Sequence, residues 1–129
     1  MLRIKQVILI RKDLKMRRGK EIAQGSHASA EFLIKRLRGV SAKSMVALQL
    51  TEVEEQWINA GMAKVCLKVE SEEQLLSLHK QALAKGLASS LIRDSGKTEF
   101  GGQPTFTSCA IGPDKVEAID AITSDLKLY

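Results

Sequence analysis

Apolar and polar positions follow two different periodicities along this chain, which predicts strands interleaved with helices. Four short apolar runs rich in β-branched residues are expected to be strands, at residues 4–10, 63–69, 88–93 and 105–111. Helical spacing is found at residues 20–38, 51–61, 71–86 and 112–123. Strands that alternate with helices favour an α/β fold in which helices cover both faces of a sheet.

Turn and capping residues set the expected boundaries of these elements. Gly39 is expected to end the first helix. Residues 51–54 and 71–74 have the spacing of capping boxes, which open helices. The Gly-Pro-Asp turn at 112–114 is expected to start the last helix, whereas residues 40–50 fit no regular element.

The first helix carries a polar stripe that core packing does not explain. At about 100° per residue, Lys20, Gln24 and His27 fall on one face together with Glu31. A second face is expected to pack against the sheet, and it consists of Ile22, Ala23, Ser26, Ala30, Leu33 and Leu37. The polar stripe is either a functional surface or the solvated side of an ordinary surface helix.

Length and composition fit one soluble domain spanning residues 1–129. The chain is 44% hydrophobic and 27% charged, which is ordinary for a globular protein. Since no apolar run approaches the ~20 residues of a membrane span, and residues 7–10 are too short for a signal-peptide core, we expect a cytoplasmic protein. Cys66 and Cys109 lie in strand-like runs and are expected to be buried. Their spacing to the two histidines does not fit a metal site, so none is expected.

The positive charge is concentrated near the start of the chain. The formal net charge is +5, with a pI near 9.4. The basic residues of the first third are Arg11, Lys12, Lys15, Arg17, Arg18, Lys20, Lys35, Arg36 and Arg38. Such a patch indicates a polyanionic partner such as a nucleic acid, although for any one residue the alternative is solubility. Because aromatic residues make up only 4% of the chain, base stacking is not expected to dominate.

A second polar cluster follows the third predicted strand. Asp94, Lys97 and Thr98 lie on a loop containing Gly96. The Gly-Lys-Thr sequence is not a phosphate-binding loop, because Leu91 stands where that motif requires its first glycine. A carboxylate, a cation and a hydroxyl can orient water and stabilise an oxyanion. The alternative is that Asp94 caps its own turn and Thr98 is a polar residue at a strand edge.

These motifs, taken in order, resemble those of the type 2 peptidyl-tRNA hydrolases of archaea and eukaryotes. The resemblance runs through residues 7–10, 13–16, 19–20, 24–28, 57, 61, 64–65, 69–75, 94–98, 110–113 and 126–128. It implies a three-layer α/β/α fold with a four-stranded mixed sheet and a cytoplasmic homodimer that acts on peptidyl-tRNA without a cofactor or metal. The chain departs from the family pattern at Ser95 and at residues 100–105.

The resemblance also assigns roles to the two polar clusters. Lys20, Asp94 and Thr98 match the family's catalytic residues, and Gln24 and His27 lie alongside. Water would attack the ester with Asp94 orienting it and Lys20 stabilising negative charge, while His27 is a base, a substrate contact or a structural residue. Phosphate contacts are expected from Lys12, Arg17, Arg18 and Lys97. The competing interpretations are a non-catalytic RNA-binding protein on the same fold and a hydrolase of small esters.

Overall fold

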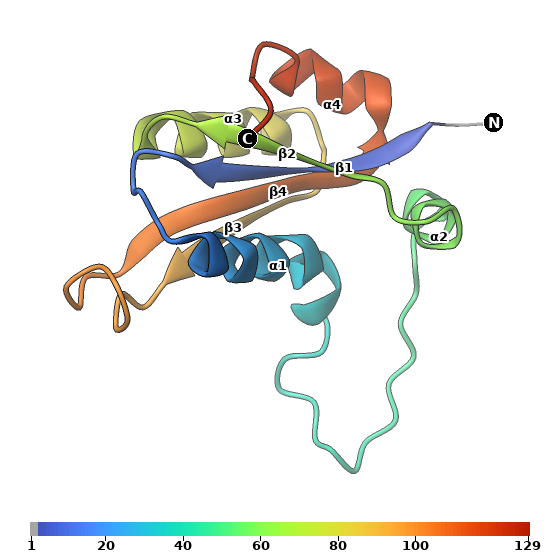
Figure 1. Cartoon of the computed structure of the whole chain (residues 1–129). Coiled ribbons are helices and arrows are strands. Elements are labelled where there is room, and N and C mark those ends of the chain that lie inside the picture. The colour runs from blue at the N-terminus through green and yellow to red at the C-terminus, as the bar shows by residue number, and fades with distance from the viewer. Residues whose placement is uncertain (1–2) are drawn as a thin grey trace.

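The computed structural model describes residues 3–129 and is built on one four-stranded sheet (Figure 1). The strands are β1 (Ile4–Arg11), β2 (Lys64–Val69), β3 (Ser89–Asp94) and β4 (Thr105–Lys115), in the order β2-β1-β4-β3. β1 pairs with β2 in parallel and with β4 antiparallel, and β3 pairs with β4 antiparallel. The predicted α/β fold with a four-stranded mixed sheet is therefore confirmed.

Four helices complete the fold, on both sides of the sheet. They are α1 (Arg18–Ile34), α2 (Glu52–Asn59), α3 (Glu72–Ala84) and α4 (Val116–Thr123). Figure 1 shows α3 and α4 on one face, α1 on the other, and α2 beyond one end of the strands. Within the described part of the chain, no helix has the length and apolar character needed to cross a membrane.

The central strand β1 supplies apolar side chains to both layers of the core. Leu9 packs in a cluster with Leu75 of α3 and Ile119 of α4, whereas Ile8 lies on the opposite face with Ala28 of α1. Full burial of a side chain of this size contributes about 1.5–3 kcal/mol to folding. The continuous apolar run that predicted a buried strand is therefore the axis of the core.

The buried face of α1 differs from the predicted one. Gly25, Ala28 and Phe32 face the sheet, and a side chain on Gly25 would lie within 3.7 Å of Ile8 and Ile10. The residues predicted to pack are instead exposed or half-buried, namely Ile22, Ala23, Ser26, Ala30, Leu33 and Leu37. Small residues allow the helix to approach the sheet closely, and this requirement outweighs the hydrophobicity of the other face.

The end of α1 also differs, because the helix stops at Ile34 and not at Arg38. Beyond Ile34 the backbone bonds tighten to three-residue turns. The guanidinium of Arg36 is held by both carboxylate oxygens of Glu54 in α2, at 3.1 and 2.7 Å, and Arg38 pairs with Glu31. These tertiary ion pairs favour turns over another helical turn.

Residues 112–114 belong to β4 and do not start the last helix, which begins at Val116. Asp114 and Lys115 continue the pairing with β1, opposite Lys5 and Ile4. Gly112 has φ +101°, and a Cβ there would approach the Lys5 carbonyl oxygen to 2.8 Å. The turn signal thus marks an irregularity inside β4. The strand continues past this point because the first residues of β1 also require hydrogen-bonding partners.

The two cysteines lie in different environments. Cys109 is buried in β4, as predicted, but Cys66 of the edge strand β2 is exposed, so the prediction for Cys66 was wrong. Both are free thiols. Burial raises the pKa of the Cys109 thiol to about 11, which makes it unreactive.

Residues 35–51 between α1 and α2 form an extended arm that leaves the body of the molecule (Figure 1). Its exposed large apolar side chains are Leu37, Val40, Met45, Val46, Leu48 and Leu50. A stretch this apolar without a core of its own is typical of a surface that packs against another molecule.

Candidate active site

Lys20, Asp94 and Thr98 meet at one end of the sheet. The Lys20 ammonium donates to Asp94 Oδ1 at 3.0 Å and to Thr98 Oγ1 at 2.9 Å. Lys20 lies in the first turn of α1, Asp94 is the last residue of β3, and Thr98 belongs to the loop before β4. The structure therefore brings together the three residues to which the family resemblance assigns catalysis.

The loop of residues 95–104 closes on itself and returns Thr98 towards α1. Gly96 has φ +80°, and a Cβ there would lie 2.0 Å from the Gln103 carbonyl oxygen, so only glycine fits. The Gly102 N–H donates to the Gly96 carbonyl at 3.0 Å. The Gly96 N–H donates to Asp94 Oδ2 at 2.9 Å, so this carboxylate both caps the loop and faces Lys20.

Asp94 is held in its ionised form. Its side chain, like that of Lys20, is 14% exposed. Burial alone raises the pKa of Asp94, but the Gly96 N–H, the Lys20 ammonium and the Gln24 amide outweigh burial and lower the pKa below its usual value. The group is thus a charged hydrogen-bond acceptor at neutral pH.

Gln24 links this carboxylate to the interior of the protein. Its Nε2 donates to Asp94 Oδ1 at 3.2 Å, and its Oε1 accepts from the hydroxyl of Thr107. Ser108 Oγ donates to the Gln24 backbone carbonyl at 3.0 Å. Sequence reasoning missed Thr107, although two adjacent polar residues in an otherwise apolar strand break the expected alternation and mark the position.

His27 lies one helical turn beyond Gln24 and is exposed. It lines a shallow hollow of about 310 Å³ together with Gln24, Asp94 and Arg93. Within residues 3–129, no hydrogen bond joins His27 to Lys20, Asp94 or Thr98. This position suits a group that meets the substrate better than one that activates the Asp94 carboxylate.

Phe100 forms an apolar wall beside Lys20. The ammonium lies 5.8 Å from the centre of the Phe100 ring, within the range of a cation–π interaction. The ring also packs against the cluster that contains Ile8 and Ile10. The segment in which the chain departs from the family pattern is therefore anchored to the core.

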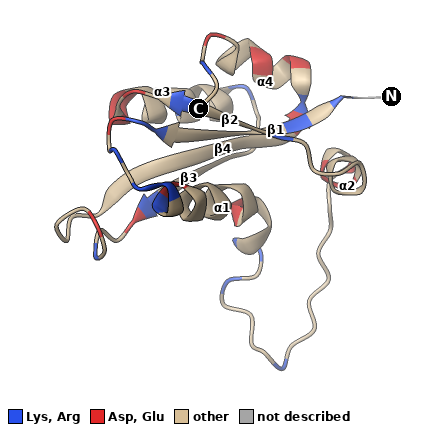
Figure 2. Cartoon of the chain, in the orientation of Figure 1, with Lys and Arg blue, Asp and Glu red and all other residues tan. Residues whose placement is uncertain are grey.

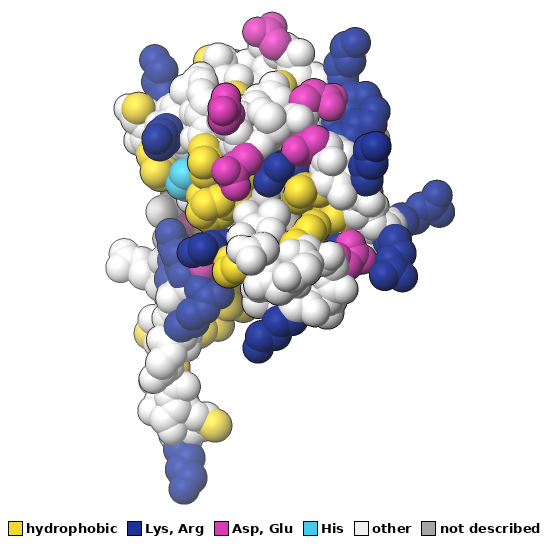
Figure 3. Space-filling model, turned by 90° about the vertical axis from the view of Figure 1, so that its left-hand side faces the viewer, with side chains coloured by type: hydrophobic (Ala, Val, Ile, Leu, Met, Phe, Trp, Pro, Cys, Tyr) yellow, Lys and Arg dark blue, Asp and Glu magenta, His cyan; other side chains and the backbone are white. Residues whose placement is uncertain are grey.

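The four predicted phosphate contacts are exposed but do not form a single cluster. Arg17 is 85% exposed and pairs with Glu99 at 3.3 Å. Arg18 is the first residue of α1, and Lys97 lies in the loop that follows β3. Lys12 lies instead beside Lys68, whose pKa it lowers, a neighbour that sequence reasoning missed. Figure 2 shows Lys and Arg positions along the ribbon at this end of the molecule, and Figure 3 shows their side chains on this face with acidic ones among them.

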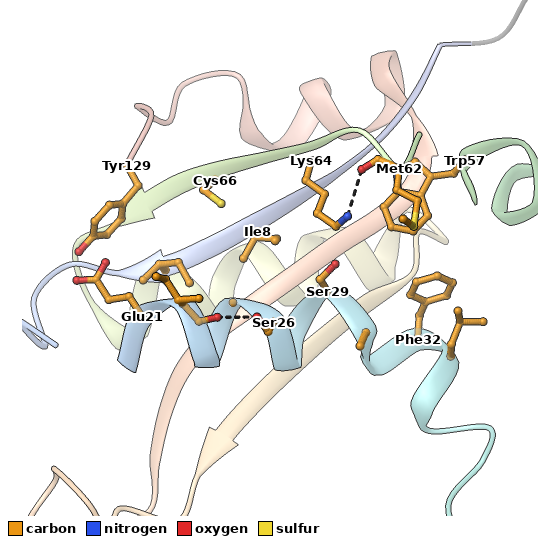
Figure 4. A pocket seen from close by; sticks show the side chains of 15 residues that line it. Ile8, Glu21, Ser26, Ser29, Phe32, Trp57, Met62, Lys64, Cys66 and Tyr129 are labelled. Atoms are coloured by element: carbon orange, nitrogen blue, oxygen red, sulfur yellow. Dashed lines mark hydrogen bonds between the residues drawn. The ribbon is translucent and has the colours of Figure 1, made fainter. Parts of the chain in front are cut away.

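A larger groove lies on the opposite flank of α1, between this helix and β2 (Figure 4). It encloses about 640 Å³ and is lined mostly by apolar side chains, including Ile22, Leu33 and Met62. Tyr129 lies at one end near Glu21, and burial together with that carboxylate raises the pKa of the Tyr129 hydroxyl to about 12. We call this feature the α1–β2 groove; it is separate from Asp94 and Thr98.

The part of the chain that the structure describes contains no group of three or more His, Cys, Asp or Glu side chains able to hold a metal ion. The donors at the site are one carboxylate, one amide and one hydroxyl around an ammonium group. The arrangement is suited to positioning water and stabilising developing negative charge.

Comparison with known proteins places the chain in a family. The model of the family "Peptidyl-tRNA hydrolase PTH2" matches residues 4–129. The peptidyl-tRNA hydrolase of Methanocaldococcus jannaschii is 41% identical over 97% of this chain and 99% of its own length, and that of Methanopyrus kandleri is 43% identical over 96% and 97%. A solved protein of unknown function from Agrobacterium shares the fold, with a TM-score of 0.60 at 14% identity over 100% of this chain and 99% of its own. The chain therefore belongs to the PTH2 family of peptidyl-tRNA hydrolases.

Proposed function

We propose that this protein hydrolyses the ester bond between the peptide and the tRNA in peptidyl-tRNA. The observation that carries the proposal is the convergence of the Lys20 ammonium, the Asp94 carboxylate and the Thr98 hydroxyl within hydrogen-bonding distance of one another. Membership of the PTH2 family supports the identity of the substrate. Because this substrate arises during protein synthesis, we place the enzyme in the cytoplasm.

Water is the nucleophile in the mechanism that this geometry supports. A water molecule held by Asp94 and Thr98 attacks the ester carbonyl, and its proton moves to the Asp94 carboxylate as the new C–O bond forms. The Lys20 ammonium stabilises the negative charge on the tetrahedral intermediate. The bond to the ribose oxygen then breaks, and the proton is delivered to that leaving oxygen.

Most of the rate acceleration should come from Lys20 and from orientation of the water. General-base catalysis is strongest when the pKa of the base lies near the working pH. Lys20, Gln24 and the Gly96 N–H hold the pKa of Asp94 below its usual value, so Asp94 is a weak base. Removal of one preformed donor to an oxyanion typically costs about 10²- to 10³-fold in turnover, which makes Lys20 the larger contributor.

Binding of the tRNA is assigned to basic side chains around this end of the sheet. Arg17, Arg18 and Lys97 flank the site, and Lys12 with Lys68 extends the positive surface towards β2. Gln24 and His27 face the hollow next to Asp94 and are assigned to the part of the substrate near the ester. Since the basic residues are spread out and exposed, contacts to the phosphate backbone should dominate over base recognition.

We also infer that the enzyme is a homodimer, formed through the α1–β2 groove. The groove is apolar and exposes Ile22 (63% exposed) and Met62. The same chain has an arm, residues 35–51, whose large apolar side chains are exposed. In a two-fold symmetric pair, the arm of each protomer would pack in the groove of its partner. Both apolar surfaces would then be covered in one contact.

Release of the acyl group from an N-acetylated aminoacyl-tRNA tests the proposed activity directly. Wild-type protein should release the N-acetylated amino acid, and Asp94→Asn should release it far more slowly. A non-catalytic RNA-binding protein would release nothing in either case. A hydrolase of small esters would cleave an ester lacking tRNA equally well, with rates independent of salt.

A further inference from the structure

β4 contains a bulge directly behind the catalytic carboxylate. Its pairing with β3 shifts register between Ile92, which lies opposite Ser108, and Arg93, which lies opposite Phe106. Thr107 therefore has no partner in β3. Bulges of this kind redirect side chains and are common beside active sites.

The bulge brings two consecutive hydroxyls to the same residue of α1. In a regular strand, Thr107 and Ser108 would point to opposite faces of the sheet. Here Thr107 donates to the side-chain oxygen of Gln24, and Ser108 donates to the backbone carbonyl of Gln24 at 3.0 Å. Only the Thr107 hydroxyl reaches the amide group that contacts Asp94.

Burial gives the Thr107 contact its effect on orientation. Thr107 is fully buried and Gln24 is 2% exposed, so water does not readily replace either partner. The ionised carboxylate of Asp94 only accepts hydrogen bonds, and the amide must therefore turn its N–H towards Asp94. The Oε1 of Gln24 then faces β4, where the Thr107 hydroxyl is its donor.

We propose that Thr107 is a positioning residue for the proposed hydrolytic reaction, because it fixes the Gln24 amide with its N–H towards Asp94. Without the Thr107 hydroxyl, the buried Oε1 loses its donor and the amide is free to turn. A turned amide would place an oxygen against Asp94 Oδ1, on the side where Lys20 also binds. The proposal rests on the activity assigned above but concerns a residue that does not touch the substrate.

We expect the other titratable and charged groups around Asp94 to keep their places when Thr107 is changed, because the Thr107 hydroxyl bonds to Gln24. Lys20 donates to Asp94 directly, and the titratable and charged side chains that line the adjoining hollow are His27, Glu31, Arg38 and Arg93. Lys97 and Glu99 lie on the following loop. Since these groups remain in place, a change in the titration of Asp94 would report the loss of the Gln24 N–H.

The test compares Thr107→Val, Thr107→Ser and Ser108→Ala in the full chain. Thr107→Val removes the hydroxyl at nearly constant volume, Thr107→Ser retains it, and Ser108→Ala removes the neighbouring hydroxyl without touching the amide. We expect Thr107→Val to lower kcat on N-acetylated aminoacyl-tRNA about 10-fold, in the range of couplings within hydrogen-bonded networks, with little change in KM. It should also move the acid limb of the pH–rate profile, and the Asp94 carboxyl titration followed by NMR, to higher pH.

The controls separate positioning from a loss of stability. Thr107→Ser should restore both the rate and the Asp94 titration, and Ser108→Ala should lower the melting temperature while leaving the titration unchanged. An Asp94 titration in Thr107→Val that equals the wild-type one would overturn the proposal. So would an altered Asp94 titration in Thr107→Ser, and this second measurement remains informative if the valine variant does not fold. Inactive wild-type protein would refute the assigned activity instead, because the NMR titration needs no substrate.

Discussion

The ammonium nitrogen of Lys20 lies 3.0 Å from a carboxylate oxygen of Asp94, although 74 positions separate the two residues in the chain. The contact forms because α1 packs on the sheet through the face that contains Gly25 and Ala28. This packing places the first turn of α1 over the end of β3. Thr98 completes the group from a loop that only glycine at position 96 allows to close. The site therefore depends on helix packing and loop geometry together.

Replacement of Lys20 by alanine should leave a folded protein with greatly reduced turnover. Loss of a preformed donor to an oxyanion costs about 10²- to 10³-fold in kcat. Steady-state hydrolysis of N-acetylated aminoacyl-tRNA measures the loss, and circular dichroism checks the fold. Lys80→Ala, on the exposed side of α3, is the matched control and should retain full activity. Turnover within a few-fold of wild type in Lys20→Ala would remove Lys20 from the mechanism.

Substrate binding should weaken steeply with salt. Each phosphate contact contributes roughly 0.7–0.9 to the slope of log K against log salt concentration. Arg17→Gln, Arg18→Gln and Lys97→Gln should each reduce the slope by about this amount, as measured by fluorescence titration of labelled tRNA. Lys85→Gln, at the far end of α3, should leave it unchanged. Equal slopes in all four variants would argue against a phosphate-binding role for these residues.

The Arg36–Glu54 pair should stabilise the protein at neutral pH and lose this effect in acid. Burial raises the pKa of Glu54, but Arg36 and the Thr51 backbone N–H outweigh it and lower the pKa. A lowered carboxyl pKa stabilises the fold above the unfolded value of about 4.3 and loses that contribution as pH falls through the folded value.

Glu54→Gln should therefore cost about 1.5–3 kcal/mol in the free energy of unfolding at pH 7, the range for hydrogen bonds to charged groups. Urea denaturation from pH 7 to pH 3 measures the difference between variant and wild type, which should shrink below about pH 4. Glu52→Gln, exposed on the same helix, serves as the control. A difference that is constant down to pH 3 would contradict the assigned pKa direction.

Dimer formation through the α1–β2 groove should be abolished by a charge in the middle of its apolar surface. Ile22→Asp should shift the protein to a monomer in sedimentation velocity, because a charge buried without a partner in a contact costs several kcal/mol. Leu83→Asp changes another exposed apolar residue, on α3 and remote from the groove, and should leave the dimer intact. A wild-type protein that sediments as a monomer at all concentrations would refute the inferred dimer.

The two thiols should differ in their reaction with an alkylating reagent. Cys66 is exposed and lines the α1–β2 groove, whereas Cys109 is fully buried with a pKa of about 11. Native protein should therefore be labelled at Cys66 alone. The labelling of Cys66 should slow as the protein concentration rises, because the dimer covers the groove that Cys66 lines. Peptide mass spectrometry identifies the labelled residue, and rapid labelling of Cys109 would contradict the described core.

Local signals in the sequence predicted the elements of the fold well. Thr51 and Glu54 form the capping box expected from their spacing, with reciprocal bonds of 2.9 and 3.1 Å. The apolar run of β1 is buried on both faces, as continuous hydrophobicity indicates. These predictions succeeded because each depends on residues close together in the chain.

Features that depend on distant parts of the chain were not predicted. The hydrophobicity of Ile22 suggested that it packs in the core, but the close approach of α1 to the sheet selects Gly25 instead. The local turn signal at Asp114 predicts the start of a helix, because the pairing of Asp114 with Lys5 is invisible in the local sequence. The same holds for Thr107, whose orientation comes from a bulge relative to another strand.

The candidate catalytic group was visible in the sequence only as two separate clusters. Helical spacing put Lys20 and Gln24 on one face, and glycine marked the loop that carries Asp94 and Thr98. Their union required the resemblance to a known family, since periodicity alone does not state which loop faces which helix. The structure then supplies the distances that join the clusters.

The most direct measurement of whether Lys20 and Asp94 act as one unit is a double-variant cycle on the hydrolysis of N-acetylated aminoacyl-tRNA. Residues that act together in one step show losses that do not add. We predict that the Lys20→Ala/Asp94→Asn double variant has about the same kcat/KM as the more damaged single variant. Losses that multiply in the double variant would show that the two groups act independently and would contradict the account.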